Sequence, residues 1–344
     1  MKISNTIKPD ITVLLSCYNA DKWLNLAIES ILTQTFTNFE LIIINDGSTD
    51  NTLEIINNYV NKDNRIIVID KKNTGLADSL NIGIHHAKGQ WIARIDSDDL
   101  CEKNRLEKQY NFVHKNNKIV LLGTGFFEID EHGKLIKEHT YPTKHNKLLS
   151  NLQRAKRFFP HSSAFYKTEA VRQIGGYRPC IKRSEDTDLW LRLSEIGNIG
   201  CMENKLVSIR KHSGQISHDE FGKRQIIDSY AARICYFIRQ KGSIEPLTNV
   251  NNDNINLFFN WVDNALKKAN VYEKNQHWSN SRNIFFSTPN RFLGISKFFV
   301  KFLNSKYFVS IVYEKIYGNL ISKKLATKWI QELKYTNDTH PKQN

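Results

Sequence analysis

The chain has 344 residues, of which 40% are hydrophobic and 24% are charged. These proportions are typical of a globular protein and exclude collagen-like, low-complexity and globally disordered classes. Five cysteines, an odd number without a C-x-x-C pair, argue against a disulfide scaffold or a thiolate zinc site and favour a reducing compartment. No stretch approaches the roughly 18–20 apolar residues of a spanning helix, and no secretory signal fits the N-terminus, so we expect a cytoplasmic protein.

The formal net charge is +14, and much of it lies near the C-terminus. Residues 282–344 contain 11 lysines and arginines against three acidic residues, together with 12 of the 38 aromatic residues. Apolar residues recur there at helical spacing, which predicts either helices packed on the rest of the protein or a basic amphipathic surface on an anionic membrane. No helix-turn-helix, zinc-finger or RNA-recognition motif accompanies the charge, so we expect no nucleic-acid partner.

Four short apolar runs rich in β-branched residues alternate with helical patterns in the first half of the chain. The runs are Ile11–Ser16, Leu41–Ile44, Ile66–Ile69 and Trp91–Ile95. Between them apolar residues recur at helical spacing, and Asp21 is placed as the N-cap of the first helix. Strands separated by helices of about 10–15 residues predict βαβ units and an α/β fold with a mainly parallel sheet. Because the runs are continuously apolar, both faces of this sheet are predicted to be buried.

In such sheets the ligand site lies beyond the carboxyl ends of the strands. The residues that follow the four runs would bring an aromatic ring, several carboxylates, two amines and flexible turns to one edge: residues 17–19, 45–48, 71–73 and 96–99. No G-x-G-x-x-G follows the first strand, and no G-x-x-x-x-G-K-[ST] occurs in the chain. These absences disfavour a dinucleotide-binding dehydrogenase and a P-loop enzyme.

The segment 96–99, Asp-Ser-Asp-Asp, is the first candidate site. Carboxylates two residues apart on a turn can converge on Mg²⁺ or Mn²⁺, which proteins hold with one or two carboxylates plus substrate phosphates. The alternative is a turn that caps the following helix, because aspartate suits helix N-termini.

Asp46 is the second candidate, and it also has two interpretations. Together with Gly47 it fits ordinary turn chemistry before a helix. Alternatively, its carboxylate accepts a hydrogen bond from a nucleobase N–H while Tyr18 stacks on that base.

Glu185 and Asp186 follow Ser184, which predicts the N-cap of a helix with acidic residues in its first turn. The functional alternative is that one of the two carboxylates is a general base for a hydroxyl nucleophile. His212 is either a packing residue or a group that completes a cation's coordination or contacts a diphosphate.

Taken together, these segments resemble the inverting glycosyltransferases of family 2, which build bacterial surface polysaccharides. Five motifs carry the resemblance, which covers about residues 10–215; they are residues 12–19, 44–50, 73–83, 91–99 and 185–193. The resemblance implies a GT-A domain over residues 1–219, with a nucleotide-binding, mainly parallel sheet flanked by helices. Residues 220–344 would then form a helical C-terminal region.

The resemblance also implies a role for each candidate residue. Tyr18 would stack on the base of the donor, and Asp46 would bind the N–H of that base. Asp98 would hold a divalent metal, Mn²⁺ or Mg²⁺, and His212 would complete its coordination. Asp186 is the expected catalytic base, with Glu185 as the alternative. The remaining donor-binding residues are expected to be Ser16, Asn19, Lys72, Asp96 and Ser97.

The implied reaction transfers a sugar, with inversion, from a UDP-hexose or UDP-N-acetylhexosamine to a hydroxyl of a lipopolysaccharide, lipooligosaccharide or capsule precursor. A lipid-linked acceptor would suit a peripheral position on the cytoplasmic face of the inner membrane. Two alternatives remain, a nucleotidyltransferase and a non-catalytic glycan-binding relative. The helix start at Glu185 and the Asp46 turn favour sugar transfer over the first. The complete acidic set argues against the second: Asp46, Asp96, Asp98 and Asp186.

Overall fold

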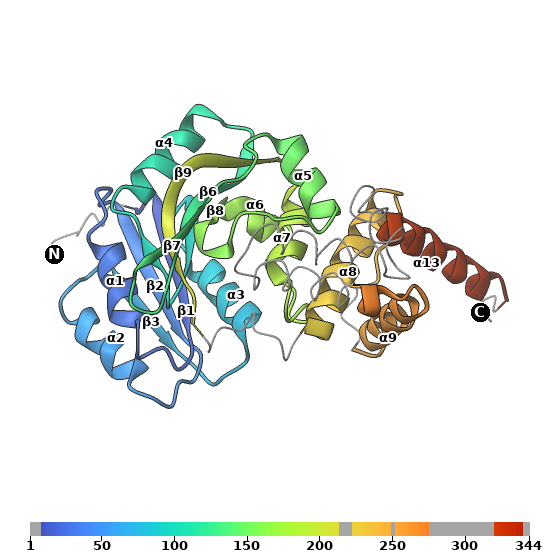
Figure 1. Cartoon of the computed structure of the whole chain (residues 1–344). Helices are drawn as coiled ribbons and strands as arrows, with labels where there is room; N and C mark the ends of the chain where they lie inside the picture. Colours follow the sequence, from blue (N-terminus) through green and yellow to red (C-terminus); the bar gives the residue numbers. More distant parts are fainter. Residues whose placement is uncertain (1–7, 213–221, 249–251, 275–319, 340–344) are drawn as a thin grey trace, which may run out of the picture. The chain divides into compact units, whose positions relative to one another are not determined.

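The computed structural model describes residues 8–212, 222–248, 252–274 and 320–339 (Figure 1). The chain divides into two compact units, Met1–Leu152 with Lys156–Glu220, and Gln153–Ala155 with Phe221–Asn344. Each unit is described by itself.

The first unit is a mixed α/β structure built on one nine-stranded sheet with the strand order β3-β2-β1-β4-β8-β6-β9-β5, and β7 pairs with β6 at its side. The strands are β1 (Ile11–Cys17), β2 (Phe39–Asn45), β3 (Ile66–Asp70), β4 (Trp91–Asp96), β5 (Leu100–Cys101), β6 (Ile119–Ile129), β7 (Leu135–His139), β8 (Phe165–Lys167) and β9 (Asn198–Arg210). The helices are α1 (Leu24–Leu32), α2 (Thr52–Val60), α3 (Leu76–His86), α4 (Arg105–Lys115), α5 (His145–Gln153), α6 (Thr168–Gln173) and α7 (Glu185–Leu193), with a 3₁₀ turn η1 (His161–Ser163).

The four predicted strands are confirmed as β1 to β4, and each of them begins within two residues of the expected position. β1 pairs in parallel with β2 and β4, and β2 pairs in parallel with β3. The carboxyl ends of the four strands therefore meet at one edge, where Ser16 lies opposite Asp96 and Cys17 lies opposite Asn45. The predicted mainly parallel sheet is confirmed, and most of its paired residues lie in parallel ladders.

Helices cover both faces of this sheet, as its continuously apolar strands require (Figure 1). Val13 and Leu15 belong to a core shared with α1, α2 and α4. Leu14 points to the opposite face, where α3 packs so closely that a Cβ at Gly83 would lie 2.1 Å from Leu14 Cδ1. Glycine suits this position because any larger residue would require the buried Leu14 side chain to move.

The other half of the sheet brings distant segments to β4. β8 pairs antiparallel with β4, and the Arg94 amide donates to the Ala164 carbonyl at 2.9 Å. This pairing places η1 beside the end of β4. β9 runs parallel to β6 and ends at Arg210, two residues before His212.

The prediction that Asp21 caps the first helix is wrong. α1 begins at Leu24 with Trp23 in the N-cap position, and no side chain caps it. The Asp21 amide instead donates to Asp50 Oδ2 at 3.2 Å. The loop after β1 is thus tied to the loop after β2, a contact that local sequence does not reveal.

The second unit contains the helices α8 (Gly222–Arg239), α9 (Asn252–Lys268) and α13 (Leu320–Thr339). Trp261 of α9 packs against Trp329 of α13 with ring centroids 4.9 Å apart, and Trp261 Nε1 donates to Glu332 at 2.7 Å. No helix in the described part of the chain is long and apolar enough to cross a membrane. Of the basic segment 282–344, for which helices or an amphipathic surface were predicted, residues 282–319 and 340–344 lie outside the described residues, and the described part is α13.

Candidate active site

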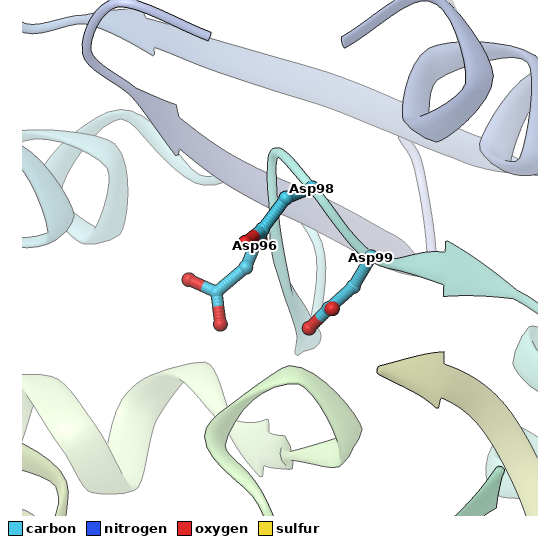
Figure 2. A group of neighbouring side chains, drawn as sticks. All are labelled: Asp96, Asp98 and Asp99. Atoms are coloured by element: carbon cyan, nitrogen blue, oxygen red, sulfur yellow. The ribbon is translucent and has the colours of Figure 1, made fainter. Parts of the chain in front are cut away.

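The end of β4 and the turn that leads to β5 carry three aspartates, Asp96, Asp98 and Asp99, here called the aspartate turn (Figure 2). One carboxylate oxygen from each lies within 4.8 Å of the others. Asp99 is buried, whereas Asp96 and Asp98 are half-buried, as is Ser97 between them. Negative charges at such separations repel one another unless cations or protons compensate them.

Arg94 compensates Asp96. Its guanidinium is only 2% exposed and binds both carboxylate oxygens of Asp96. Burial by itself would raise the pKa of Asp96, but the charge and hydrogen bonds of Arg94 outweigh it and lower that pKa. Asp96 therefore stays ionised, and the charge of Arg94 largely neutralises it.

Ser162 of η1 lies between two of the carboxylates. Its Oγ is 2.8 Å from Asp96 Oδ2 and also hydrogen-bonds to Asp99. The other oxygen of Asp99 accepts the Arg210 amide at 3.0 Å. Burial and the neighbouring charges of Asp98 and Asp96 raise the pKa of Asp99 well above its usual value. Asp99 is thus committed to contacts within the protein.

Asp98 has a different partner. His212 Nε2 lies 2.9 Å from Asp98 Oδ2, so the structure brings the two predicted metal residues together. Burial and the charge of Asp96 raise the pKa of Asp98, and the hydrogen bond from His212 opposes this shift. The donor set of one carboxylate and one imidazole, with Asp96 nearby, fits a divalent cation such as Mn²⁺.

At the neighbouring strand ends, the loops after β1 and β2 are joined through Asn19. Its amide donates to Ser48 Oγ at 3.0 Å, and its Oδ1 accepts the Thr49 amide at 2.8 Å. Tyr18 stands beside this junction with 52% of its surface exposed, so its ring is available for stacking on a planar ligand. Ser16 lies half-buried near the end of β1.

Asp46 organises the loop that leads into α3. Its Oδ1 accepts the Thr74 amide and its Oδ2 accepts the Gly75 amide, both at 2.9 Å. Lys71 Nζ forms an ion pair with the same carboxylate. The predicted Lys72 is exposed, and its carbonyl accepts a hydrogen bond from Lys71 at 3.0 Å. The amine that contacts Asp46 is therefore Lys71, which sequence reasoning did not single out.

Glu185 and Asp186 form the first turn of α7, with Ser184 at the predicted N-cap position. Burial and the charge of Asp186 raise the pKa of Glu185 to about 8. Burial also raises the pKa of Asp186, but the Thr187 amide, 2.6 Å from Asp186 Oδ1, favours the ionised form. Burial thus raises the pKa of both carboxyl groups.

His161 links this acidic pair to the aspartate turn. It directly precedes Ser162, and its Nδ1 lies 4.0 Å from Glu185 Oε1. Its Nε2 is 2.7 Å from the Tyr177 hydroxyl. Burial and the positive charge of Arg94 hold the pKa of His161 well below its usual value, so the ring is neutral at pH 7. His161, Arg94 and Tyr177 were not singled out as site residues from the sequence, although Arg94 lies within the motif 91–99.

Comparison with known proteins places this site in a family. The family model described as glycosyl transferase family 2 matches residues 12–175. EpsE of Bacillus subtilis (strain 168), which carries a glycosyltransferase assignment, is 36% identical over 222 residues, 62% of this chain and 77% of the relative. The chain belongs to glycosyltransferase family 2. Another relative, the O-antigen biosynthesis glycosyltransferase WbnJ of Escherichia coli, is 38% identical over 191 residues, 55% of this chain and 74% of the relative.

Solved structures show the fold of this family 2 glycosyltransferase. S. aureus TarS 1–349 in complex with UDP-GlcNAc aligns with a TM-score of 0.57 and 15% identity, covering 94% of this chain and 92% of that one. The mannosyltransferase PcManGT from Pyrobaculum calidifontis, in complex with GDP-Man and Mn²⁺, aligns with a TM-score of 0.50 and 14% identity, covering 90% and 88% of the two chains. The predicted GT-A fold is confirmed.

Proposed function

We propose that this glycosyltransferase moves a sugar from a nucleotide donor, a UDP-hexose or UDP-N-acetylhexosamine, to a hydroxyl of a cell-surface glycan precursor, with inversion. The observation that carries the proposal is that two clusters of acidic side chains in the first unit are connected by a chain of contacts. The aspartate turn and the Glu185–Asp186 pair are linked through η1, where His161 lies by Glu185 and Ser162 binds Asp96. WbnJ, named for O-antigen biosynthesis, supports the class of acceptor. The UDP-GlcNAc complex of TarS supports the class of donor.

The donor's nucleoside would bind at the ends of β1 and β2. The exposed ring of Tyr18 offers a stacking surface for the base. Asp46 accepts one amide on Oδ2 and one amide plus Lys71 on Oδ1. A carboxylate oxygen accepts about two hydrogen bonds, so Oδ2 retains one lone pair for the N–H of a base. Ser16, Asn19, Lys72, Asp96 and Ser97 would line the rest of the donor site.

Asp98 and His212 are the residues that would hold a divalent cation. When bound there, the cation would neutralise charge that develops on the leaving diphosphate. Asp96 adds less charge to this site because Arg94 already binds both of its oxygens.

Asp186 would take the proton of the acceptor hydroxyl. Its pKa is raised, which strengthens it as a base, and the Thr187 amide still favours its ionised form. Glu185, whose pKa is raised to about 8, is mostly protonated at pH 7 and is the weaker candidate. A positioned base typically contributes a factor of ~10²–10⁴ in rate. One in-line displacement inverts the anomeric centre, so an α-linked donor would yield a β-linked product.

A screen of nucleotide sugars tests the proposal. The 344-residue chain is incubated with each donor and Mn²⁺, then with EDTA, and release of the nucleoside diphosphate is measured. We expect one UDP-sugar to be preferred and EDTA to abolish its turnover. Asp98→Asn should reduce turnover by a factor of ~10² or more, as expected when charge stabilisation is lost. Glu169→Gln changes an exposed carboxylate on α6 and is the matched control.

Two results would contradict parts of this proposal. Folded protein that binds no nucleotide sugar would refute the donor assignment. An α-linked product from an α-linked donor, identified by NMR, would refute the single displacement with Asp186 as base.

A further inference from the structure

Arg210 is a buried arginine whose contacts reach three loops around the candidate metal residues. It is the last residue of β9 and is only 2% exposed. Removing a guanidinium from water is costly, so a buried arginine requires several well-placed acceptors. The positions of those acceptors indicate what Arg210 holds in place.

The first loop is the aspartate turn. The Arg210 amide donates to Asp99 Oδ1 at 3.0 Å, and its Nε donates to the Asp98 carbonyl at 3.1 Å. Arg210 therefore holds both the backbone of Asp98 and the side chain of the next residue. These bonds restrict the directions in which the Asp98 carboxylate can point.

The second loop joins β6 to β7. An Arg210 terminal nitrogen donates to the carbonyls of Asp130, at 3.3 Å, and Glu131, at 3.1 Å. The following residue, Lys211, donates its amide to Ile129 at 2.8 Å. The end of β9 is thus anchored to residues 129–131, only two residues before His212.

The third loop precedes α1 and contributes Trp23. The guanidinium carbon of Arg210 lies 5.5 Å from the centroid of the Trp23 ring. The same ring lies 4.3 Å from the centroid of His212. Trp23 therefore lies against both Arg210 and His212, and it restricts the imidazole that faces Asp98.

We propose that Arg210 is a positioning residue that holds Asp98 and His212 in the mutual orientation required to bind a divalent cation. The inference rests on the metal site of the proposed function. Arg210 acts on Asp98 through its carbonyl and on His212 through Trp23. Lysine cannot replace it, because a single ammonium group lacks the planar set of donors that reaches the separate acceptors and stacks on the indole.

Binding of Mn²⁺ tests this role without relying on turnover. Mn²⁺ is titrated into the full chain, alone and with UDP, and the free ion is measured by electron paramagnetic resonance. We expect Arg210→Lys to weaken Mn²⁺ binding by a factor of ~10–100, as substitutions behind metal ligands typically do. Arg172→Lys is the control for losing a guanidinium that donates to several carbonyls: Arg172, which is exposed, donates to those of Ile84, His85 and Ala87 without contacting the aspartate turn.

The outcomes separate the inference from the proposed function. Equal Mn²⁺ binding by wild type and Arg210→Lys overturns the inference and leaves the metal site standing. Absence of Mn²⁺ binding by wild type overturns the metal site itself. If Arg210→Lys loses the circular dichroism of the folded protein, Trp23→Leu replaces it, since this change removes the aromatic contact and keeps the hydrogen bonds. Unchanged Mn²⁺ binding by Trp23→Leu would then overturn the part of the inference in which Arg210 acts on His212 through Trp23.

Discussion

Replacing Glu185 by glutamine is expected to make the stability of the protein less dependent on pH. Burial and the charge of Asp186 raise the pKa of Glu185 from an ordinary 4.5 to about 8 in the folded protein. The folded state therefore retains a proton that the unfolded chain releases near pH 4.5. Glutamine is neutral, nearly isosteric with the protonated acid, and does not titrate.

The sign and size of the effect follow from proton linkage. A group whose pKa is raised on folding stabilises fully below its unfolded pKa, and this contribution is lost as the pH rises through the folded pKa. Each pKa unit corresponds to about 1.4 kcal/mol. Between pH 5 and pH 8 the wild type should lose about 3 kcal/mol more of its free energy of unfolding than Glu185→Gln does.

Urea denaturation at several pH values between 5 and 8, followed by fluorescence and circular dichroism, measures the difference. Glu169→Gln removes an acid whose side chain is 84% exposed, and it should track the wild type at every pH. Asp186 titrates in both proteins. The difference between their pH dependences therefore reports the titration of Glu185 and its charge repulsion with Asp186. Parallel stability curves for wild type and Glu185→Gln would show that the Glu185 site does not favour the protonated acid.

Two further substitutions test the catalytic assignment and the packing. Asp186→Asn should lower kcat by a factor of ~10²–10⁴ while the donor affinity, measured by calorimetry, stays near the wild-type value. If the donor affinity fell by the same factor as kcat, Asp186 would be a donor-binding residue and not the base that accepts the proton of the acceptor hydroxyl. Gly83→Ala should destabilise the protein by about 1–3 kcal/mol, because the added Cβ would lie 2.1 Å from Leu14 Cδ1. Gly222→Ala, which meets nothing within 4 Å, is its control in thermal denaturation.

The sequence by itself was sufficient to predict the parallel part of the sheet. Strands buried on both faces must be apolar throughout, so β1 to β4 are visible as continuous runs such as Ile11–Ser16. The carboxyl ends of adjacent parallel strands share an edge, so the sequence alone predicts that Tyr18, Asp46 and Asp98 lie at that edge. The order of the motifs also identified the family, because five short patterns in a fixed order rarely occur together in unrelated proteins.

Tertiary structure alone decided which side chains compensate the acidic groups. Lys71 and Lys72 are adjacent amines, and only the course of the turn after β3 directs Lys71 to Asp46. Arg94 lies within an apolar strand, where the sequence does not show whether its charge is paired.

The same limit applies to contacts between distant segments. Ser162 binds Asp96 from 66 positions away, and Arg210 reaches the Asp98 carbonyl from 112 positions away. Such contacts depend on how β8 and β9 enter the sheet, and strand pairing over long separations leaves no local pattern. Tyr18, Asp46 and Asp98 follow strand ends that the sequence marks, whereas the residues that contact them from distant segments are chosen by packing.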